Sequence, residues 1–190
     1  MKAIFAIFGV LVGVTWASPL LTPLKGYTIV PMTWLGINTT DGLEIAVSGT
    51  IQEIQSQVQS MNDSIVWKMS STQQSIKPRS KKNIVCNSGG DGGADNVFVQ
   101  QGIDYLKSIK NGPCGAPPGP NKCSRISCSY GAGIFLCNDT PKEIHHDCPD
   151  LATYAEDIRS NCHTEGVVTY VRGQQFDTEG FSVVVGHDQC

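Results

Sequence analysis

Hydrophobic residues recur at helical spacing in the first half of the chain. Six of them lie alternately four and three residues apart, with mostly polar residues between them: Val47, Ile51, Ile54, Val58, Met61 and Ile65. Such a stripe predicts an amphipathic helix over about residues 47–68, whose apolar face needs a partner to cover it. The apolar, proline-containing stretch over residues 26–37 is expected to form an extended arm ahead of this helix.

The second half of the chain alternates between strand-like and helix-like patterns. Period-two alternation or short apolar runs predict strands over 83–87, 125–130, 134–137, 167–171 and 181–185. Apolar stripes predict one helix after Asp95 or Asn96 and a second that opens at Cys148-Pro149-Asp150. The order is strand, helix, strand, strand, helix, strand and one extra strand. It predicts an α+β fold of the split βαβ (ferredoxin-like) type, a two-layer sandwich with two helices on one face of an antiparallel sheet.

The N-terminus has the features of a secretory signal peptide. Lys2 is followed by an apolar stretch of about 11 residues, which suits a signal-peptide core and is too short to span a bilayer. Small residues at Thr15 and Ala17 fit cleavage after Ala17. We therefore expect loss of residues 1–17, a mature protein without a transmembrane segment, and secretion to the extracellular space. An uncleaved hydrophobic anchor is the alternative, but no stop-transfer charges follow.

All the cysteines lie in the second half of the chain. There are eight of them: Cys86, Cys114, Cys123, Cys128, Cys137, Cys148, Cys162 and Cys190. An even number in a secreted protein predicts four structural disulfides, and the sequence leaves their pairing open. Zinc binding is the alternative, but the spacings contain no Cys-x-x-Cys pair.

A change of charge divides the chain at Lys81-Lys82. Residues 18–82 carry six basic and four acidic residues, whereas residues 83–190 carry seven basic and thirteen acidic residues. A dibasic pair at such a border in a secretory protein predicts cleavage by a kexin-type protease, and a solvated basic linker is the alternative. The predicted organisation is a signal peptide at 1–17, a prosegment at 18–82 with its amphipathic helix, and a cysteine-rich α/β domain at 83–190.

Composition and charge exclude several classes of function. Charged residues make up 16% of the chain, and the formal net charge is −3. This balance argues against a basic nucleic-acid-binding protein and against a charge-driven disordered chain. Three sequons, at Asn38, Asn62 and Asn138, are candidate glycosylation sites on a secreted surface.

Candidate catalytic residues are few. The strongest local cluster is His145-His146-Asp147, in which either histidine could serve a hydrolase as a base. A solvated turn ahead of a helix is the alternative. The chain has no Gly-x-Ser-x-Gly or His-Glu-x-x-His motif, and oxidised cysteines leave no thiol nucleophile. We therefore expect a protein that is not an enzyme and has no cofactor or metal site.

Several segments together resemble a group of small secreted fungal cysteine-rich proteins. They are CSRISCSY at 123–130, LCND at 136–139, GQQFD at 173–177 and the final Cys190. In its split βαβ order and dibasic border, the chain also resembles the killer toxins encoded by viruses of smut fungi and the cellular effectors related to them. This resemblance implies a small α/β sandwich that acts on target-cell membranes or ion channels rather than by hydrolysis. The chain differs from the smut toxins in its net acidity, and the resemblance assigns no functional residue.

The sequence thus predicts a secreted, disulfide-rich interaction protein, killer-toxin-like or effector-like. Its partner would be an unidentified target-cell membrane component or extracellular protein, and not nucleic acid. A small secreted hydrolase that uses His145 or His146 and a structural cell-wall or matrix protein are the alternatives.

Overall fold

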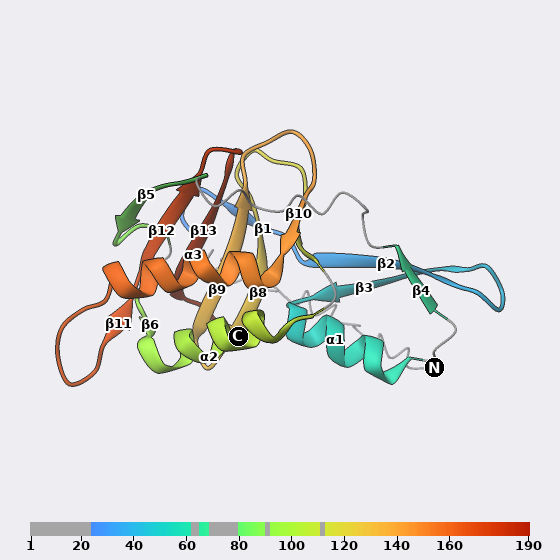
Figure 1. Cartoon of the computed structure of the whole chain (residues 1–190), viewed down its shortest axis with the longest axis horizontal. Coiled ribbons are helices and arrows are strands. Elements are labelled where there is room, and N and C mark those ends of the chain that lie inside the picture. Colours follow the sequence, from blue (N-terminus) through green and yellow to red (C-terminus); the bar gives the residue numbers. More distant parts are fainter. Residues whose placement is uncertain (1–23, 62–64, 69–79, 90–91, 111–112) are drawn as a thin grey trace, which may run out of the picture.

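The computed structural model describes residues 24–61, 65–68, 80–89, 92–110 and 113–190 (Figure 1). The predicted signal peptide with Ala17, and the sequon at Asn62, lie outside the described residues. Within them the chain forms three helices and thirteen strands, so the expected α+β class is confirmed. The helices are α1 (Ile51–Ser60), α2 (Asn96–Ser108) and α3 (Cys148–Asn161).

A six-stranded sheet forms the centre of the molecule. Its strands lie in the order β1 (Thr28–Ile29), β8 (Lys122–Ser129), β9 (Ala132–Asn138), β13 (Phe181–His187), β12 (Gly173–Asp177) and β5 (Lys81–Cys86). All neighbours are antiparallel except β1, which lies parallel to β8. The tight turn between β8 and β9 uses Tyr130 and Gly131 at φ values of 47° and 81°, the positive values that a type I′ turn requires. Helices α2 and α3 pack side by side across one face of this sheet (Figure 1).

The order of the strands in the central sheet does not confirm the predicted ferredoxin-like arrangement. A βαβ unit joins two parallel strands of one sheet through a crossover helix. Here α2 joins β5 to β8, which run parallel but have β12, β13 and β9 between them, and α3 joins β9 to β12, which run parallel with β13 between them. The difference arises because β12 and β13, which a short turn joins, form a hairpin that occupies the space between β9 and β5.

Alternating side chains of the central strands contribute to two hydrophobic cores. On the face that the helices cover, Ile134 and Leu136 join the main core with side chains of α2 and α3. On the opposite face, Phe135 and Val184 form a second cluster with Leu24. Strand β9 is therefore buried along its whole length.

Three smaller sheets complete the fold of the described residues. Strand β7 (Pro113–Ala116) pairs antiparallel with β10 (Ile144–Asp147), and β6 (Ala94–Asp95) pairs antiparallel with β11 (Tyr170–Val171). The third sheet has the order β3 (Glu44–Gly49), β2 (Met32–Asn38), β4 (Ile65–Lys68). The strand predicted over 167–171 is thus reduced to its last two residues, and Val167 and Val168 lie in a loop.

The helix predicted over 47–68 is wrong in extent, because α1 covers only Ile51–Ser60. Its start is set by a capping box, in which Thr50 accepts from the backbone N–H of Glu53 and the Glu53 carboxylate accepts from Thr50 N (2.7 Å). Val47 lies in β3 and Ile65 in β4. A spacing of four residues fits two strand periods as well as one helical turn, which is why the stripe continues past both ends of α1.

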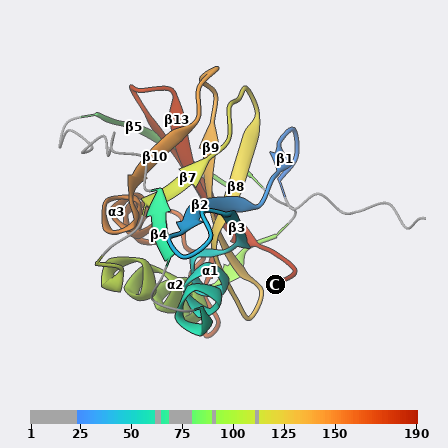
Figure 2. The ribbon, with the colours of Figure 1, turned by 90° about the vertical axis from the view of Figure 1, so that its right-hand side faces the viewer.

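The segment predicted as a prosegment belongs to the same folded unit as the cysteine-rich half. Val47, Ile51 and Ile54 are part of the main core. Figure 2 shows α1 and the β2–β3 hairpin beside α2 and the central sheet. The division into prosegment and domain, which depends on processing, stays a prediction.

Four disulfides join all eight cysteines, as their even number predicted. The pairs are Cys86–Cys162, Cys114–Cys148, Cys123–Cys137 and Cys128–Cys190. The first ties β5 to the end of α3, and the second ties β7 to its start. Each such crosslink stabilises a fold by about 2–4 kcal/mol, mainly by restricting the unfolded chain, and four of them fit an oxidising compartment.

Candidate functional site

The loop between α3 and β11 projects from one end of the molecule (Figure 1). Two hydrogen bonds close its base: Thr164 N donates to Tyr170 O (2.8 Å), and Tyr170 N donates to Thr164 Oγ1 (2.9 Å). The disulfide Cys86–Cys162 anchors the chain just before the loop, and the pairing of Tyr170 with Asp95 anchors it just after. The loop is therefore held at both ends while its tip stays in solvent.

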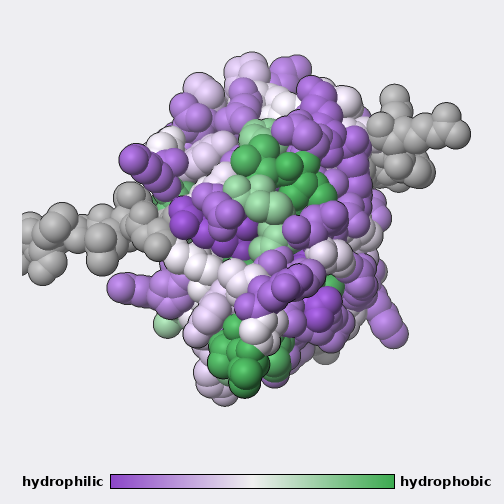
Figure 3. All heavy atoms as spheres, turned by 90° about the vertical axis from the view of Figure 1, so that its left-hand side faces the viewer, coloured by the Kyte–Doolittle hydropathy of each residue, from purple (hydrophilic) through white to green (hydrophobic). Residues whose placement is uncertain are grey.

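The tip of this loop carries exposed hydrophobic side chains. Val167 is fully exposed, and Val168 and Tyr170 are about half exposed. Val97, at the start of α2, is also exposed, and it lies at this end because β6, which leads into α2, pairs with β11, which follows the loop. We call Val97, Val167, Val168 and Tyr170 the loop surface. Figure 3 shows hydrophobic residues gathered in separate areas on this end of the molecule, surrounded by hydrophilic ones.

An exposed aromatic residue lies at the β8–β9 turn. Tyr130 is 78% exposed, and its ring stacks on Phe98 of α2 at a centroid separation of 4.8 Å. The disulfide Cys128–Cys190 ties the same hairpin to the C-terminal segment. Exposed apolar groups on an anchored backbone suit recognition, because little conformational entropy is lost when a partner binds.

The sequence pattern alone misses the loop surface, because it assigns Val167 and Val168 to a strand. The signal against a strand is Gly166, which adopts a φ of 140°. This value lies in the region that favours glycine. A glycine directly ahead of two valines therefore marks the place where the extended chain turns out into solvent.

A second candidate site is a cavity of about 130 Å³ beside His145. Its walls come from residues 30–33 of the N-terminal segment, from residues 115–117 at the end of β7, and from Ser124, Glu143 and His145. His145 Nε2 lies 3.3 Å from the Glu143 carboxylate. The ring lies against Gly115, where an added Cβ would come within 2.7 Å of Nδ1. Glycine at position 115 is thus what leaves room for the imidazole.

This cavity does not assemble a nucleophile with its base. Such a pair needs the serine hydroxyl and the ring nitrogen within about 3.2 Å of each other. Ser124 Oγ and His145 Nδ1 each have no hydrogen-bond partner, so they are not bonded to one another. Ser124 is also completely buried, so a substrate carbonyl does not reach its hydroxyl in this conformation. His145 has a carboxylate neighbour but no paired nucleophile.

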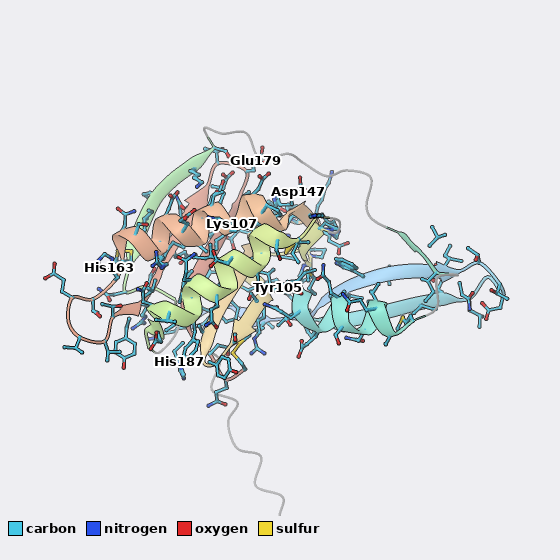
Figure 4. All side chains as sticks on the ribbon, turned by 60° about the horizontal axis from the view of Figure 1, so that its bottom comes forward. Tyr105, Lys107, Asp147, His163, Glu179 and His187 are labelled. Carbon is cyan, nitrogen blue, oxygen red and sulfur yellow. A yellow bond between two sulfur atoms is a disulfide. The ribbon has the colours of Figure 1, made fainter. Side chains whose placement is uncertain are left out.

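His146 lies on the opposite side of β10 from His145. It is buried, and its ring centroid is 4.4 Å from that of Phe181 in the core. Figure 4 places His163 and His187 well away from Asp147, so the histidines do not converge. Among the described residues, no group of three or more His, Cys, Asp or Glu is placed to hold a metal ion.

Lys81 and Lys82, the predicted processing pair, are the first residues of strand β5. Lys81 Nζ lies 2.6 Å from Asp157 Oδ2 and 4.6 Å from the ring centroid of Tyr154, whereas Lys82 is exposed. The Tyr154 hydroxyl donates to Asp177 Oδ2 (2.6 Å). Burial, reinforced by this hydrogen bond, raises the pKa of Tyr154. The predicted cleavage site is therefore built into the edge of the central sheet.

The sequons differ in exposure. Asn138 is fully buried, and its Nδ2 donates to Pro117 O (2.8 Å) and Lys142 O (2.6 Å). The nitrogen that would carry a glycan already donates both hydrogen bonds in the folded chain, which argues against a glycan on Asn138. Asn38 lies partly exposed at the β2–β3 turn, where its Nδ2 donates to Asp41 (3.2 Å). Asn38 is therefore the sequon that the described surface offers.

None of the described helices has both the length and the apolarity needed to cross a bilayer. No family model, curated protein or solved structure matches this chain. Its function is therefore inferred from its own residues and their geometry.

Proposed function

We propose that this protein is a secreted interaction protein, toxin-like or effector-like, which binds its partner through the loop surface. The full exposure of Val167 carries the proposal. A valine left in water contributes nothing to folding, whereas its burial against a partner contributes about 1.5–3 kcal/mol to binding. Val168 and Tyr170 lie on the same anchored loop and extend the apolar area.

The scaffold supports a role outside the cell. Four disulfides anchor the sheet, both ends of α3 and the C-terminus, and crosslinking of this density is typical of small secreted proteins. The signal-like N-terminus points the same way. The resemblance to killer toxins and related effectors supports action by binding to a target rather than by catalysis.

The partner is expected to be either a target-cell membrane component or an extracellular protein. The charge of this chain favours an extracellular protein over a lipid surface. The formal net charge is −3, and Glu165 lies within the loop itself. Anionic membrane surfaces attract clusters of lysine and arginine, and residues 163–170 contain neither. Attachment to a membrane would have to depend on the valines alone.

The test compares the full secreted chain with two variants. One carries Val167→Asp and Val168→Asp together. The other carries Leu43→Asp, which changes a similarly exposed residue in the β2–β3 turn at the opposite end of the molecule (Figure 1). Each protein is applied to competing fungi and to host tissue, growth and cell death are scored, and captured partners are identified.

We expect the wild type and Leu43→Asp to act alike and the double variant to lose at least about tenfold in activity, the loss typical of a binding hot spot. Full activity of the double variant would move the site away from the loop surface. A wild-type protein with no effect and no partner on any target would contradict the proposed function itself.

A further inference from the structure

We infer that residues 24–61 are a permanent part of the working protein, so that cleavage after Lys82 would yield a non-covalent two-chain complex rather than a free cysteine-rich domain. This segment contains no cysteine, so disulfides do not hold it and its retention depends on packing. It contacts residues 83–190 in three separate places. The inference does not depend on which surface binds the external partner.

The first contact covers the far face of the central sheet. Leu24 is fully buried in a cluster with Phe135 and Val184. Strand β1 adds a parallel neighbour to β8, and Gln174 Nε2 donates to the Tyr27 hydroxyl (2.9 Å). Loss of this arm would expose an aromatic and an aliphatic side chain of the central strands to water.

The second contact joins β2 to β7. The buried Trp34 donates its Nε1–H to Pro113 O (3.1 Å), and the backbone N–H of Gly115 points to Met32 Sδ (3.2 Å). In both cases, a side chain of the segment satisfies a backbone group of the cysteine-rich half. Removing partners from buried polar groups is costly. Residues 30–33 also supply one wall of the cavity beside His145, so that cavity exists only while the segment is bound.

The third contact is made by helix α1. Ile51 and Ile54 are fully buried in the main core. Gln52 Nε2 donates to Ser127 Oγ of β8 (2.6 Å), and the Tyr105 hydroxyl of α2 donates to Gln55 Oε1 (2.8 Å). Figure 4 marks Tyr105 on the part of α2 next to α1.

These contacts lie on both faces of the sheet, so the segment dissociates only if all three contacts break. Its buried hydrophobic side chains are Leu24, Met32, Trp34, Val47, Ile51 and Ile54. Buried anchors of this kind, with tryptophan among them, dominate the affinity of stable protein interfaces.

The test cuts the chain between the N-terminal segment and the cysteine-rich half at an engineered site, so it does not depend on cleavage after Lys82. A recognition sequence for a sequence-specific protease is placed within residues 70–78, between β4 and β5, in the full chain. After cleavage, size-exclusion chromatography and native mass spectrometry are run at micromolar protein. We expect both fragments to elute together at the mass of the cut complex and to separate only in strong denaturant. Elution of the N-terminal fragment on its own would overturn the inference.

Two matched variants of α1 locate the contact. Gln52→Ala with Gln55→Ala removes two hydrogen bonds across the junction and should raise the dissociation constant of the fragments about tenfold. Gln57→Ala is the control, because its Nε2 bonds within the segment, to Ser48 O (3.1 Å) and Glu53 O (3.2 Å). Equal dissociation constants for the two variants would contradict the assigned contact. Ile54→Asp should release the fragment altogether, since it places a charge in the core.

Discussion

The ammonium group of Lys81 lies 2.6 Å from the carboxylate of Asp157, so the first lysine of the predicted cleavage pair is bound to helix α3. A protease that recognises a dibasic pair must take hold of this side chain. In the folded chain it is held by Asp157 and lies over the ring of Tyr154. Cleavage between Lys82 and Asn83 therefore requires the edge strand β5 to open first.

Asp157→Asn should make the Lys82–Asn83 bond easier to cut. The ion pair is partly exposed and contributes up to about 1 kcal/mol, and cleavage follows the population of the opened strand. We expect a rate about two- to fivefold higher with a purified kexin-type protease, followed by mass spectrometry. Glu156→Gln is the control, because Glu156 lies next to Asp157 on α3 but pairs with Lys107 of α2 and not with a residue of β5. Equal cleavage rates in the two variants would show that the ion pair of Lys81 with Asp157 does not limit cleavage.

His145 and His146 should differ sharply in their effect on stability. His146→Ala removes a buried ring that packs on Phe181 and should cost about 2–4 kcal/mol of unfolding free energy. His145→Ala changes a side chain on the cavity wall and should cost less than about 1 kcal/mol. Denaturant unfolding with the disulfides intact measures both. Similar losses would contradict the opposite orientation of the two rings, and His145→Ala also tests any hydrolase activity without unfolding the protein.

Asn138 should carry no glycan, and its side chain should matter for stability instead. Asn138→Ala leaves the carbonyls of Pro117 and Lys142 without their donor, which should cost about 1–3 kcal/mol. Asn38→Gln should change stability by less than about 0.5 kcal/mol and remove any glycan at that turn. Intact mass before and after enzymatic deglycosylation, together with thermal unfolding, checks both statements. A glycan found on Asn138 would contradict its burial.

Stability should fall at high pH partly because of Tyr154. The folded state raises the pKa of its buried hydroxyl, so above the usual tyrosine pKa of about 10 the unfolded chain loses this proton first. The unfolded state then binds fewer protons than the folded state, and the free energy of unfolding drops as pH rises, by up to about 1.4 kcal/mol per pH unit for one group.

Tyr154→Phe should therefore show a shallower loss of stability above pH of about 10. At neutral pH it should be less stable by about 1–3 kcal/mol, because Asp177 loses a donor. Urea unfolding between neutral and alkaline pH measures both effects. Tyr130→Phe, at the exposed β8–β9 turn, is the control and should follow the wild type. An alkaline slope in Tyr154→Phe equal to that of the wild type would contradict this account.

Local signals predicted the starts of α2 and α3 well. Helix α2 begins at Asn96, and the Asp95 carboxylate accepts from Val97 N (2.8 Å) as a helix cap. Helix α3 begins at Cys148, with Pro149 in its first turn. The cap of α2 and the proline of α3 each act within one helical turn, so the sequence contains everything needed to place these two starts. The pairing of β8 with β9 is likewise set by neighbouring residues, because a two-residue turn joins the two strands.

The loop surface and the position of the N-terminal segment depended on distant residues. Val167 and Val168 look like strand residues by composition, but β6 pairs only with Tyr170 and Val171, and none of the described strands pairs with the two valines. The stripe that includes Ile51 and Ile54 indicated an apolar face, whereas its partner, the core under α2 and β8, lies more than forty residues further along the chain.

By itself, the sequence determined that this chain has an even set of cysteines able to form four crosslinks, the starts of two helices in its second half, and a first half without thiols. These properties follow from composition and from interactions within a few residues. Only the tertiary structure decided the strand order, the pairing of the cysteines, the burial of Asn138 and the exposure of Val167. A hydrophobic pattern states which side of an element avoids water, but which distant element covers that side is settled by packing of the whole chain.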